Sequence, residues 1–345
     1  MAAPFLVILN PASSGGKAAR LLRTVEARLD AEDVAYDLEI TGGPGHATEL
    51  TRAAVDAGRE VIVAVGGDGT VHEIAQGLLG PVQEGRPPDE RSDAVPSLAV
   101  VPIGTGNDFF RMVGASRDPD EALNVALRGT RSRFDVGVAR WDGGHRYFVN
   151  LLGLGVDVEV LRRRRAFGRL PGLAQYLAAL LTAVLRFEPF SVRIRLDGRG
   201  KGEGPEGEAE DREELVRAMH LAAVTVGPSA GGGFLLNPGA TPDDGLLDLC
   251  LVEALTYPQI ARYIPRVIRG THADLHVVEL RRFRRGRIER STGQPFWFQL
   301  DGELMAEPVP SIEVEVMPGA LPVLVPPDSS RQQPRGRDEA REGTS

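Results

Sequence analysis

The sequence predicts an α/β domain followed by a mainly β domain, and three observations support this. The chain has 345 residues, enough for two domains that each bury a core. In the first part, continuous apolar runs alternate with segments of helical period, which is typical of a parallel sheet covered on both faces. Beyond Arg133 the runs become short, β-rich and separated by turn residues, which is typical of antiparallel sheets.

The first domain is expected at residues 1–133. Continuous apolar runs predict strands at 5–9, 61–65 and 98–101. Apolar residues at helical spacing predict helices at 18–29, 47–57, 71–79 and 120–127. Thr70 and Glu73 have the spacing of a capping box, so the third helix is expected to begin there.

The second domain is expected at residues 134–311. Its strands are predicted at 134–140, 147–152, 191–196, 220–226, 246–252, 275–280, 294–300 and 312–316, with one helix at 172–187. The polar end of the chain, residues 326–345, is expected to be disordered.

Composition excludes several classes of protein. Cys250 is the only cysteine, which excludes internal disulfides and multi-cysteine metal sites. The first residues lack the pattern of a signal peptide, and the longest apolar-rich stretch, 173–185, is too short for a membrane span. We therefore expect a cytoplasmic protein.

The net charge of −8 is unevenly distributed. Residues 203–214 hold seven acidic side chains and one arginine, so most of the excess lies in one polar insert. Arginines cluster at 162–165, just before the apolar helical segment, and at 281–287. Basic clusters beside apolar helices favour peripheral contact with an anionic membrane, although solvated helix faces are the simpler alternative. Interleaved aromatic residues are sparse, so no nucleic-acid partner is expected.

The strongest motif is Gly66-Gly-Asp-Gly-Thr70, which lies between a predicted strand and a predicted helix. Glycines at such a turn bring backbone N–H groups close to a phosphate, and the helix N-terminus adds its positive dipole end. Asp68 would repel a phosphate unless a cation lay between them, so it is a candidate for holding Mg²⁺ on a nucleotide. The alternative is a glycine-rich turn that binds no ligand.

Two further loops follow strands and precede helices, at residues 10–17 and 102–108. The loops of a parallel sheet leave its carboxyl edge together, so all three could meet one polyphosphate. The P-loop and G-x-G-x-x-G fingerprints are absent. Protein-kinase and hydrolase-nucleophile motifs are absent as well.

These residues resemble the diacylglycerol kinase catalytic-domain family, in its soluble bacterial lipid-kinase branch, which is related to sphingosine and ceramide kinases. The resemblance extends from about residue 5 to residue 325. It is carried by Asn10-Pro11 with Ser13–Gly15, Gly66–Thr70, Pro102-x-Gly-Thr-x-Asn-Asp-Phe109-x-Arg111, Asn150-x-x-Gly-x-Gly-x-Asp157, Asp244-Gly-Leu-Leu-Asp248 and Asp301-Gly-Glu303.

The resemblance implies a three-layer α/β nucleotide domain, a C-terminal antiparallel β-sandwich-like domain and a cleft between them. It also implies that the last strand, about 312–325, returns to the first domain. The residues that it implies for ATP are Asn10, Pro11, Ser13, Ser14, Gly15, Thr41, Gly66, Gly67, Asp68, Gly69, Thr70, Val71, His72 and Thr105. At His72 the family commonly has Asn, so this contact differs from the pattern.

The resemblance further implies catalytic roles for Asp68, beside the nucleotide and its Mg²⁺, and for Glu303, as the proton acceptor. It implies a second Mg²⁺ held by Asp244 and by the backbone carbonyls of Thr241 and Leu246, whereas the local sequence equally fits a metal-free hairpin turn. The expected reaction is transfer of the γ-phosphate of ATP to a membrane lipid, with diacylglycerol as the first candidate. A sphingoid lipid, NAD and a non-catalytic nucleotide- or membrane-binding role stay as alternatives, and the sequence leaves homodimer formation open.

Overall fold

The computed structural model describes residues 3–14, 18–80, 95–103, 106–167, 172–197 and 212–327. Gly15, Thr105 and the expected disordered tail from residue 328 onward lie outside these ranges.

The N-terminal domain is built on a parallel sheet whose strand order is β2-β1-β3-β4. Its central strands are almost fully buried because they consist of apolar residues that face helices on both sides. The bounds are β1 (Phe5–Leu9), β2 (Tyr36–Ile40), β3 (Val61–Gly66) and β4 (Ser97–Pro102).

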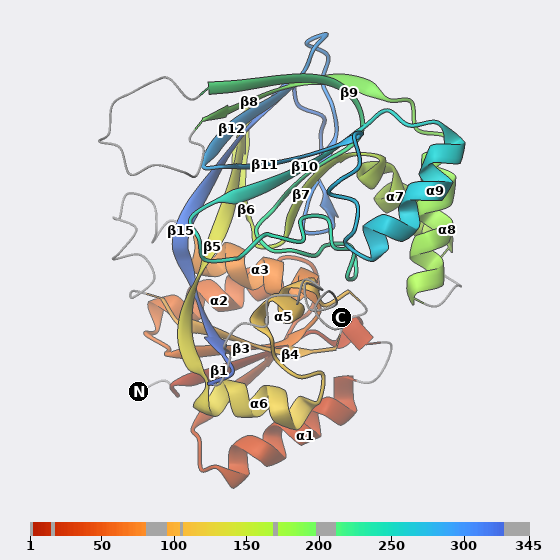
Figure 1. The fold of residues 1–345 in the computed structure, drawn as a ribbon. Coiled ribbons are helices and arrows are strands. Elements are labelled where there is room, and N and C mark those ends of the chain that lie inside the picture. Colours follow the sequence, from red (N-terminus) through yellow and green to blue (C-terminus); the bar gives the residue numbers. More distant parts are fainter. Residues whose placement is uncertain are drawn as a thin grey trace, which may run out of the picture.

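Helices cover both faces of this sheet and complete three layers (Figure 1). On the face toward the second domain lie α2 (His46–Asp56), α3 (Asp68–Leu78) and α5 (Asp108–Val113). On the opposite face lie α1 (Ala18–Ala31) and α6 (Pro119–Arg128). The carboxyl ends of the strands lead into the short 3₁₀ helix Pro11–Ser14 and into α3 and α5, so the motif loops share one edge.

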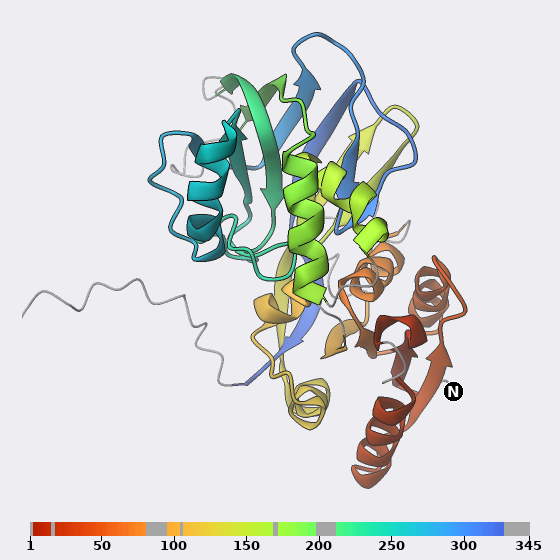
Figure 2. The ribbon, with the colours of Figure 1, turned by 90° about the vertical axis from the view of Figure 1, so that its right-hand side faces the viewer.

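Two long antiparallel strands connect the domains, β5 (Thr130–Trp141) and β15 (Ser311–Val325). They pair along almost their whole length, and β15 then joins the N-terminal sheet through the parallel pair Val323 and Leu98. Figures 1 and 2 show β15 running from the C-terminal domain into the N-terminal one. The division expected at residues 133–134 therefore falls inside β5, and the domains share a continuous sheet.

The C-terminal domain is a largely antiparallel β structure with helices α7, α8 and α9 gathered on one side (Figures 1 and 2). Its strands are β6 (Gly144–Phe148), β7 (Leu151–Gly155), β8 (Phe190–Asp197), β9 (Arg212–Thr225), β10 (Leu247–Glu253), β11 (Val278–Phe283), β12 (Arg285–Arg290), β13 (Phe298–Leu300) and β14 (Glu303–Leu304). The helices are α7 (Val156–Arg164), α8 (Gly172–Val184) and α9 (Tyr257–Ile268). None of the helices in the described part of the chain combines the length and apolar character needed to cross a bilayer.

The predicted fold class is confirmed, but several local predictions are wrong. The second domain was expected to hold one helix, at 172–187, and it also contains α7 and α9. The third helix begins at Asp68 and not near Thr70, because the expected capping box does not form. The Thr70 hydroxyl accepts a hydrogen bond from Asn10, and the Glu73 carboxylate accepts one from the backbone of Ala47. The predicted strand 147–152 is two strands, β6 and β7, separated by a turn at residues 149–150.

Candidate active site

The turn between β3 and α3 holds the strongest sequence motif. Gly66 must be glycine, since a Cβ there would lie 2.3 Å from the Thr70 hydroxyl oxygen. That hydroxyl accepts a hydrogen bond of 3.0 Å from the side-chain amide of Asn10, which joins the loop after β1 to the start of α3. Thr41, at the end of β2, is held by its backbone bond to Leu9. The structure therefore brings the first two motif loops and the end of β2 to one edge of the sheet.

The other residues predicted for ATP occupy different settings. Pro11, Ser13 and Ser14 form the short 3₁₀ helix beside this edge. Gly67 precedes α3 and Gly69 lies in its first turn. The Val71 side chain is buried in the apolar core, so only its backbone can face a ligand. His72 is also buried, and its ring is directed at the C-terminal domain.

Asp68, the first residue of α3, faces Asp108, the first residue of α5. Burial, together with the neighbouring Asp108 carboxylate, raises the pKa of Asp68 to about 6. The Asp68 side chain accepts a hydrogen bond of 3.2 Å from the backbone N–H of Phe109. Among the ion pairs of the described residues, none involves Asp68. Its carboxylate therefore lies in a setting that disfavours its charge unless a cation is added.

Asp108 links the N-terminal domain to the loop at residues 229–233 of the C-terminal domain, and the sequence analysis did not single it out. Its carboxylate accepts hydrogen bonds from the Ser229 hydroxyl at 3.1 Å and from the backbone N–H groups of Gly232 and Gly233, at 2.6 and 2.8 Å. Arg111 lies 3.0 Å from the same carboxylate. The Asp108 carboxylate thus fixes a loop of the C-terminal domain to the start of α5.

Glu303 stands beside a buried histidine–aspartate pair from both domains. Asp301 accepts hydrogen bonds from the backbone N–H groups of residues 149, 150 and 151, which explains the turn between β6 and β7. It also bonds His72 Nδ1 at 2.8 Å, so the hairpin that carries Glu303 is fixed to α3. The Glu303 carboxylate lies 3.2 Å from Arg146 and 3.8 Å from His72 Nε2.

The residues around Asp68 fit a divalent cation. Hard cations prefer carboxylate oxygens, and Asp68 offers a carboxylate whose donors are the backbone N–H groups of Asp108 and Phe109 and whose pKa is raised. The neighbouring Gly106 leaves room at this carboxylate, because a Cβ there would lie 2.6 Å from Asp68 Oδ2.

The loop that was expected to hold a second Mg²⁺ differs from the Asp68 site, because its carboxylate is already paired with an arginine. Asp244 accepts hydrogen bonds from the Thr241 hydroxyl at 2.8 Å and from the backbone of Leu246 at 3.1 Å. Arg282 lies 2.5 Å from the same carboxylate and 3.2 Å from Asp248. These donors do not fit a divalent cation as they stand, since a metal would have to displace the guanidinium. The described residues also contain no cluster of three acidic, histidine or cysteine side chains at metal-binding distance.

Comparison with known proteins identifies the family. The model of the diacylglycerol kinase catalytic domain matches residues 4–139, and that of the YegS C-terminal NAD kinase beta sandwich-like domain matches residues 150–325. A diacylglycerol kinase of Mycobacterium tuberculosis is 30% identical over 322 residues, which cover 92% of this chain and 94% of the relative. The chain belongs to the diacylglycerol kinase catalytic-domain family. It is therefore a member of a lipid kinase family, as its motifs predicted.

Two other relatives agree with this assignment. A protein of Chromohalobacter salexigens named a YegS-like lipid kinase is 30% identical and covers 91% of this chain and 92% of its own length. A solved structure from Bacillus anthracis, described as a candidate diacylglycerol kinase, is 25% identical with a TM-score of 0.74. It covers 94% of this chain and 95% of its own. Membership of a kinase family implies the use of ATP together with a divalent metal.

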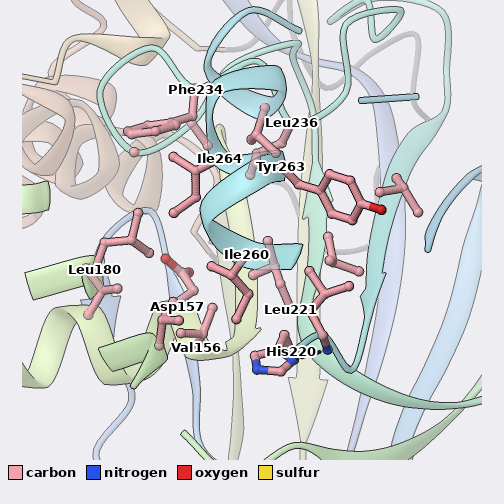
Figure 3. Close-up of a pocket in the computed structure, with 18 of the residues that line it drawn as sticks. Val156, Asp157, Leu180, His220, Leu221, Phe234, Leu236, Ile260, Tyr263 and Ile264 are labelled. Carbon is pink, nitrogen blue, oxygen red and sulfur yellow. Dashed lines mark hydrogen bonds between the residues drawn. The ribbon is translucent and has the colours of Figure 1, made fainter. Parts of the chain in front are cut away.

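A site feature that the sequence did not reveal is an apolar cavity of about 140 Å³ in the C-terminal domain (Figure 3). Ile260 and Ile264 of α9 line it opposite Leu180 of α8, and Asp157 is a rare polar group on its wall. Burial raises the pKa of Asp157, against the effect of its hydrogen bond from Gln299. The lining comes from segments between residues 151 and 278, so no local pattern could have marked it.

Proposed function

We propose that this lipid kinase transfers the γ-phosphate of ATP to the free hydroxyl of diacylglycerol, with Mg²⁺ as its metal. The observation that carries the proposal is a connection between the apolar cavity and Glu303. Asp157, on the cavity wall, accepts a hydrogen bond from the Gln299 amide, whose oxygen accepts one of 2.7 Å from the backbone of Gly302. An acyl chain in the cavity would therefore lie beside Asp157, which is linked through Gln299 to the hairpin that carries Glu303.

The nucleotide domain supplies positioning for this reaction. Phosphoryl transfer needs mainly alignment of the reacting oxygens and stabilisation of charge. The N-terminus of α3 presents free N–H groups beside Asn10 and Thr70, at the sheet edge where nucleotides bind in α/β folds. The expected ATP contacts of residues 10–15, 41, 66–72 and 105 stay part of this proposal, with His72 contributing only its backbone because its ring bonds Asp301.

Asp68 and Glu303 have different roles in the proposed mechanism. Asp68 holds the Mg²⁺ of the nucleotide, which on binding would neutralise charge on the transferring phosphate. Glu303 takes the proton of the lipid hydroxyl as the new O–P bond forms, and its side chain is 40% exposed, so it can meet an acceptor from the cleft. Asp108 positions the loop around Gly232 and Gly233 without touching the reacting atoms.

The apolar cavity suits a hydrocarbon chain better than a polar ligand. Apolar cavities of about 150 Å³ stay dry and take up small hydrocarbons. Replacing Val184, which is 6% exposed and lines the cavity from α8, by Phe would fill part of the space. We expect this variant to raise KM for long-chain diacylglycerol more than for a short-chain analogue. Equal effects on both lipids would remove the cavity from the binding site.

The outer faces of α8 and α9 suit peripheral contact with an anionic membrane. Leu181, Leu185 and Tyr257 are exposed by 59%, 48% and 58%, and the Tyr257 hydroxyl bonds the backbone oxygen of Leu185. The exposed Arg186 follows directly in the chain. We expect the double variant Leu181→Asp, Leu185→Asp to lose binding to vesicles that contain anionic lipid. Its turnover of a dispersed short-chain lipid should be unchanged, and unchanged vesicle binding would exclude this surface.

The substrate is tested with radiolabelled ATP, Mg²⁺ and a panel of lipid alcohols in mixed vesicles, with NAD as a separate acceptor. The proposal expects label on diacylglycerol. Label on a sphingoid lipid or on NAD alone would replace diacylglycerol by that acceptor. ATP binding without label on any acceptor would favour the non-catalytic alternative.

The role of Glu303 is tested by Glu303→Gln. Loss of the carboxylate should lower turnover by about 10²–10⁴-fold while ATP binding is retained, because the amide cannot accept the proton. Glu307→Gln is the matched control, since Glu307 is an exposed acid four positions further along the chain. Retained turnover in Glu303→Gln would remove this residue from the mechanism.

A further inference from the structure

His72 has a buried ring nitrogen that the mechanism above does not use. Its side chain is only 1% exposed, and Nε2 has no hydrogen-bond partner among the described residues. Leaving a buried polar atom unpaired costs stability, so the atom requires an explanation. Its nearest charged neighbour is Glu303, at 3.8 Å.

Asp301 fixes which nitrogen of His72 is free. Its carboxylate already accepts backbone N–H bonds from residues 149, 150 and 151, so it acts as an acceptor toward the ring as well. His72 Nδ1 therefore carries the hydrogen of the 2.8 Å bond, and Nε2 presents a lone pair. An aspartate that orients a histidine in this way leaves the second nitrogen ready to accept a proton.

Glu303 can reach this lone pair by a small movement. It is carried by a two-residue strand after Gly302, whose φ of +89° marks a tight turn. The same carboxylate oxygen lies 3.2 Å from Arg146 and 3.8 Å from Nε2, so it stands between a cation and a proton acceptor. Catalytic hydrogen bonds are often long without substrate and shorten in the productive complex.

A polar cavity on the side of Glu303 provides a path to solvent. It has a volume of about 600 Å³ and is lined by Glu303, His72 and Arg146 together with polar residues of α2 and α3 such as Thr48 and Gln76. It is distinct from the apolar cavity, since the two share no lining residue. His72 Nε2 itself is buried, so water in the polar cavity can exchange protons with it only after Glu303 shifts away from the ring.

We propose that His72 receives the proton that Glu303 removes from the acceptor hydroxyl, a role that rests on the function proposed above for Glu303. The O–H bond of the acceptor breaks as its oxygen bonds phosphorus, and ADP leaves with the electrons of the broken P–O bond. The proton passes to Glu303, then to His72 Nε2, and from the imidazolium to water in the polar cavity. Glu303 is thereby returned to its charged form for the next turnover. His72 is a positioning and relay residue in this scheme, since it does not touch the substrate.

The surroundings of His72 stabilise the protonated ring. Burial disfavours the imidazolium, but the hydrogen bond with Asp301 and the charges of Asp301 and Glu303 outweigh it and raise the pKa of His72 above 6.5. Arg146, from β6, acts in the opposite direction. Glu73, the next residue on α3, has its carboxylate bonded by the backbone N–H of Ala47. Because the ring must start neutral to accept a proton, the relay operates above the pKa of His72 and is lost as the pH falls below it.

The test is the pH profile of His72→Asn. An Asn side chain can still donate to Asp301 from the position of Nδ1 but has nothing at the position of Nε2. The single-turnover rate should fall about 10-fold near neutral pH, which is less than the ~10²–10⁴-fold effect of a direct proton acceptor. The effect is smaller because the half-exposed Glu303 can also lose its proton directly to water. The acid limb of the rate profile should move to lower pH, and the unfolding midpoint and ATP affinity should stay near those of the wild type.

The outcomes separate this inference from the proposed function. If Glu303→Gln abolishes turnover while His72→Asn keeps both the wild-type rate and the wild-type acid limb, the relay is wrong and the role of Glu303 stands. A lower rate with an unmoved acid limb would make His72 purely structural and would also overturn the relay. If Glu303→Gln retains turnover, the proposed mechanism itself fails. His72→Gln, which places an amide near the position of Nε2, should not restore the acid limb.

Discussion

Asp68 and Asp244 look alike in the sequence, since each directly precedes a glycine in a turn and each was expected to lie at a Mg²⁺ site. The structure gives them opposite electrostatic settings. Asp68 lies beside a second carboxylate, and burial and this neighbour raise its pKa to about 6. Asp244 has a guanidinium at 2.5 Å, a hydroxyl and a backbone donor.

The difference is that Asp244 has a cationic partner within the protein, whereas Asp68 has none among the described residues. Asp244 is paired with Arg282, which also contacts Asp248, although burial raises the pKa of Asp248 to about 6. The cleft at Asp68 is left with repulsion that an added cation would relieve, and such unfavourable settings are typical of functional sites. We infer that a metal is required in the cleft and is not required at the second loop.

Replacing Asp68 by Asn should have the largest effect and should separate activity from stability. Phosphate transfer should fall by about 10²-fold or more, because the proposed metal contact is lost. The free energy of unfolding at neutral pH should rise by about 2–3 kcal/mol, since a pKa of about 6 against the ordinary 3.8 means that folding disfavours the charge. Chemical denaturation of the wild type and Asp68→Asn without nucleotide measures this gain. A loss of stability in the variant would contradict the view that the charge of Asp68 is disfavoured in the folded protein.

The same shift predicts a pH dependence with a definite sign. Between pH 3.8 and about 6 the folded state binds the Asp68 proton more tightly than the unfolded state does. Its contribution to stability is therefore present at low pH and is lost as the pH rises through this window. The stability difference between Asp68→Asn and the wild type should grow from pH 4 to pH 7. A constant difference across this range would show that the carboxylate is not destabilised by its setting.

Replacing Arg282 by Gln should act in the opposite direction, with a smaller effect. Asp248 is 7% exposed, and without Arg282 it would lose its cationic partner, at a cost of about 1–2 kcal/mol in unfolding free energy. Arg285→Gln is the matched control, because Arg285 is 62% exposed and its ion pair is with Glu315 at the surface. The control should change stability by less than about 0.5 kcal/mol. Equal changes in unfolding free energy in both variants would show that Arg282 contributes no more than an exposed ion pair does.

The smallest expected effect is that of metal removal on the unfolding midpoint. A structural Mg²⁺ at Thr241, Asp244 and Leu246 would add stability that a chelator removes. With Arg282 in place, EDTA should leave the midpoint of the nucleotide-free wild type unchanged. A clear decrease of the unfolding midpoint with EDTA would support a structural metal at Asp244 and contradict the proposed difference between the two loops.

The sequence predicted the parts of the site that depend on local pattern. The β3 run, the glycines after it and Asp68 follow from the strand–turn–helix pattern, and the family resemblance placed Glu303 in the cleft. It missed β2, whose five residues are half polar because the strand lies at the sheet edge. It also placed one strand across residues 149–150, whose backbone groups bond Asp301 instead of continuing the strand.

Contacts between distant segments were beyond the sequence. The partners of Asp108 lie more than 120 positions away, and His72 meets Asp301 across 229 positions. The capping box at Thr70 failed for the same reason, since Asn10 from another loop takes the hydroxyl. Tertiary contacts of a side chain can override the local structural preference that its sequence predicts.

The most direct test of the account is transfer of radiolabelled phosphate from ATP to diacylglycerol in vesicles, followed across Mg²⁺ concentrations for the wild type, Asp68→Asn and Arg282→Gln. The account predicts that transfer by the wild type rises with Mg²⁺ to a plateau and that Asp68→Asn stays near background. Arg282→Gln should follow the wild-type dependence on Mg²⁺. Transfer by Asp68→Asn at the wild-type rate, or no label on any lipid, would contradict the central claim.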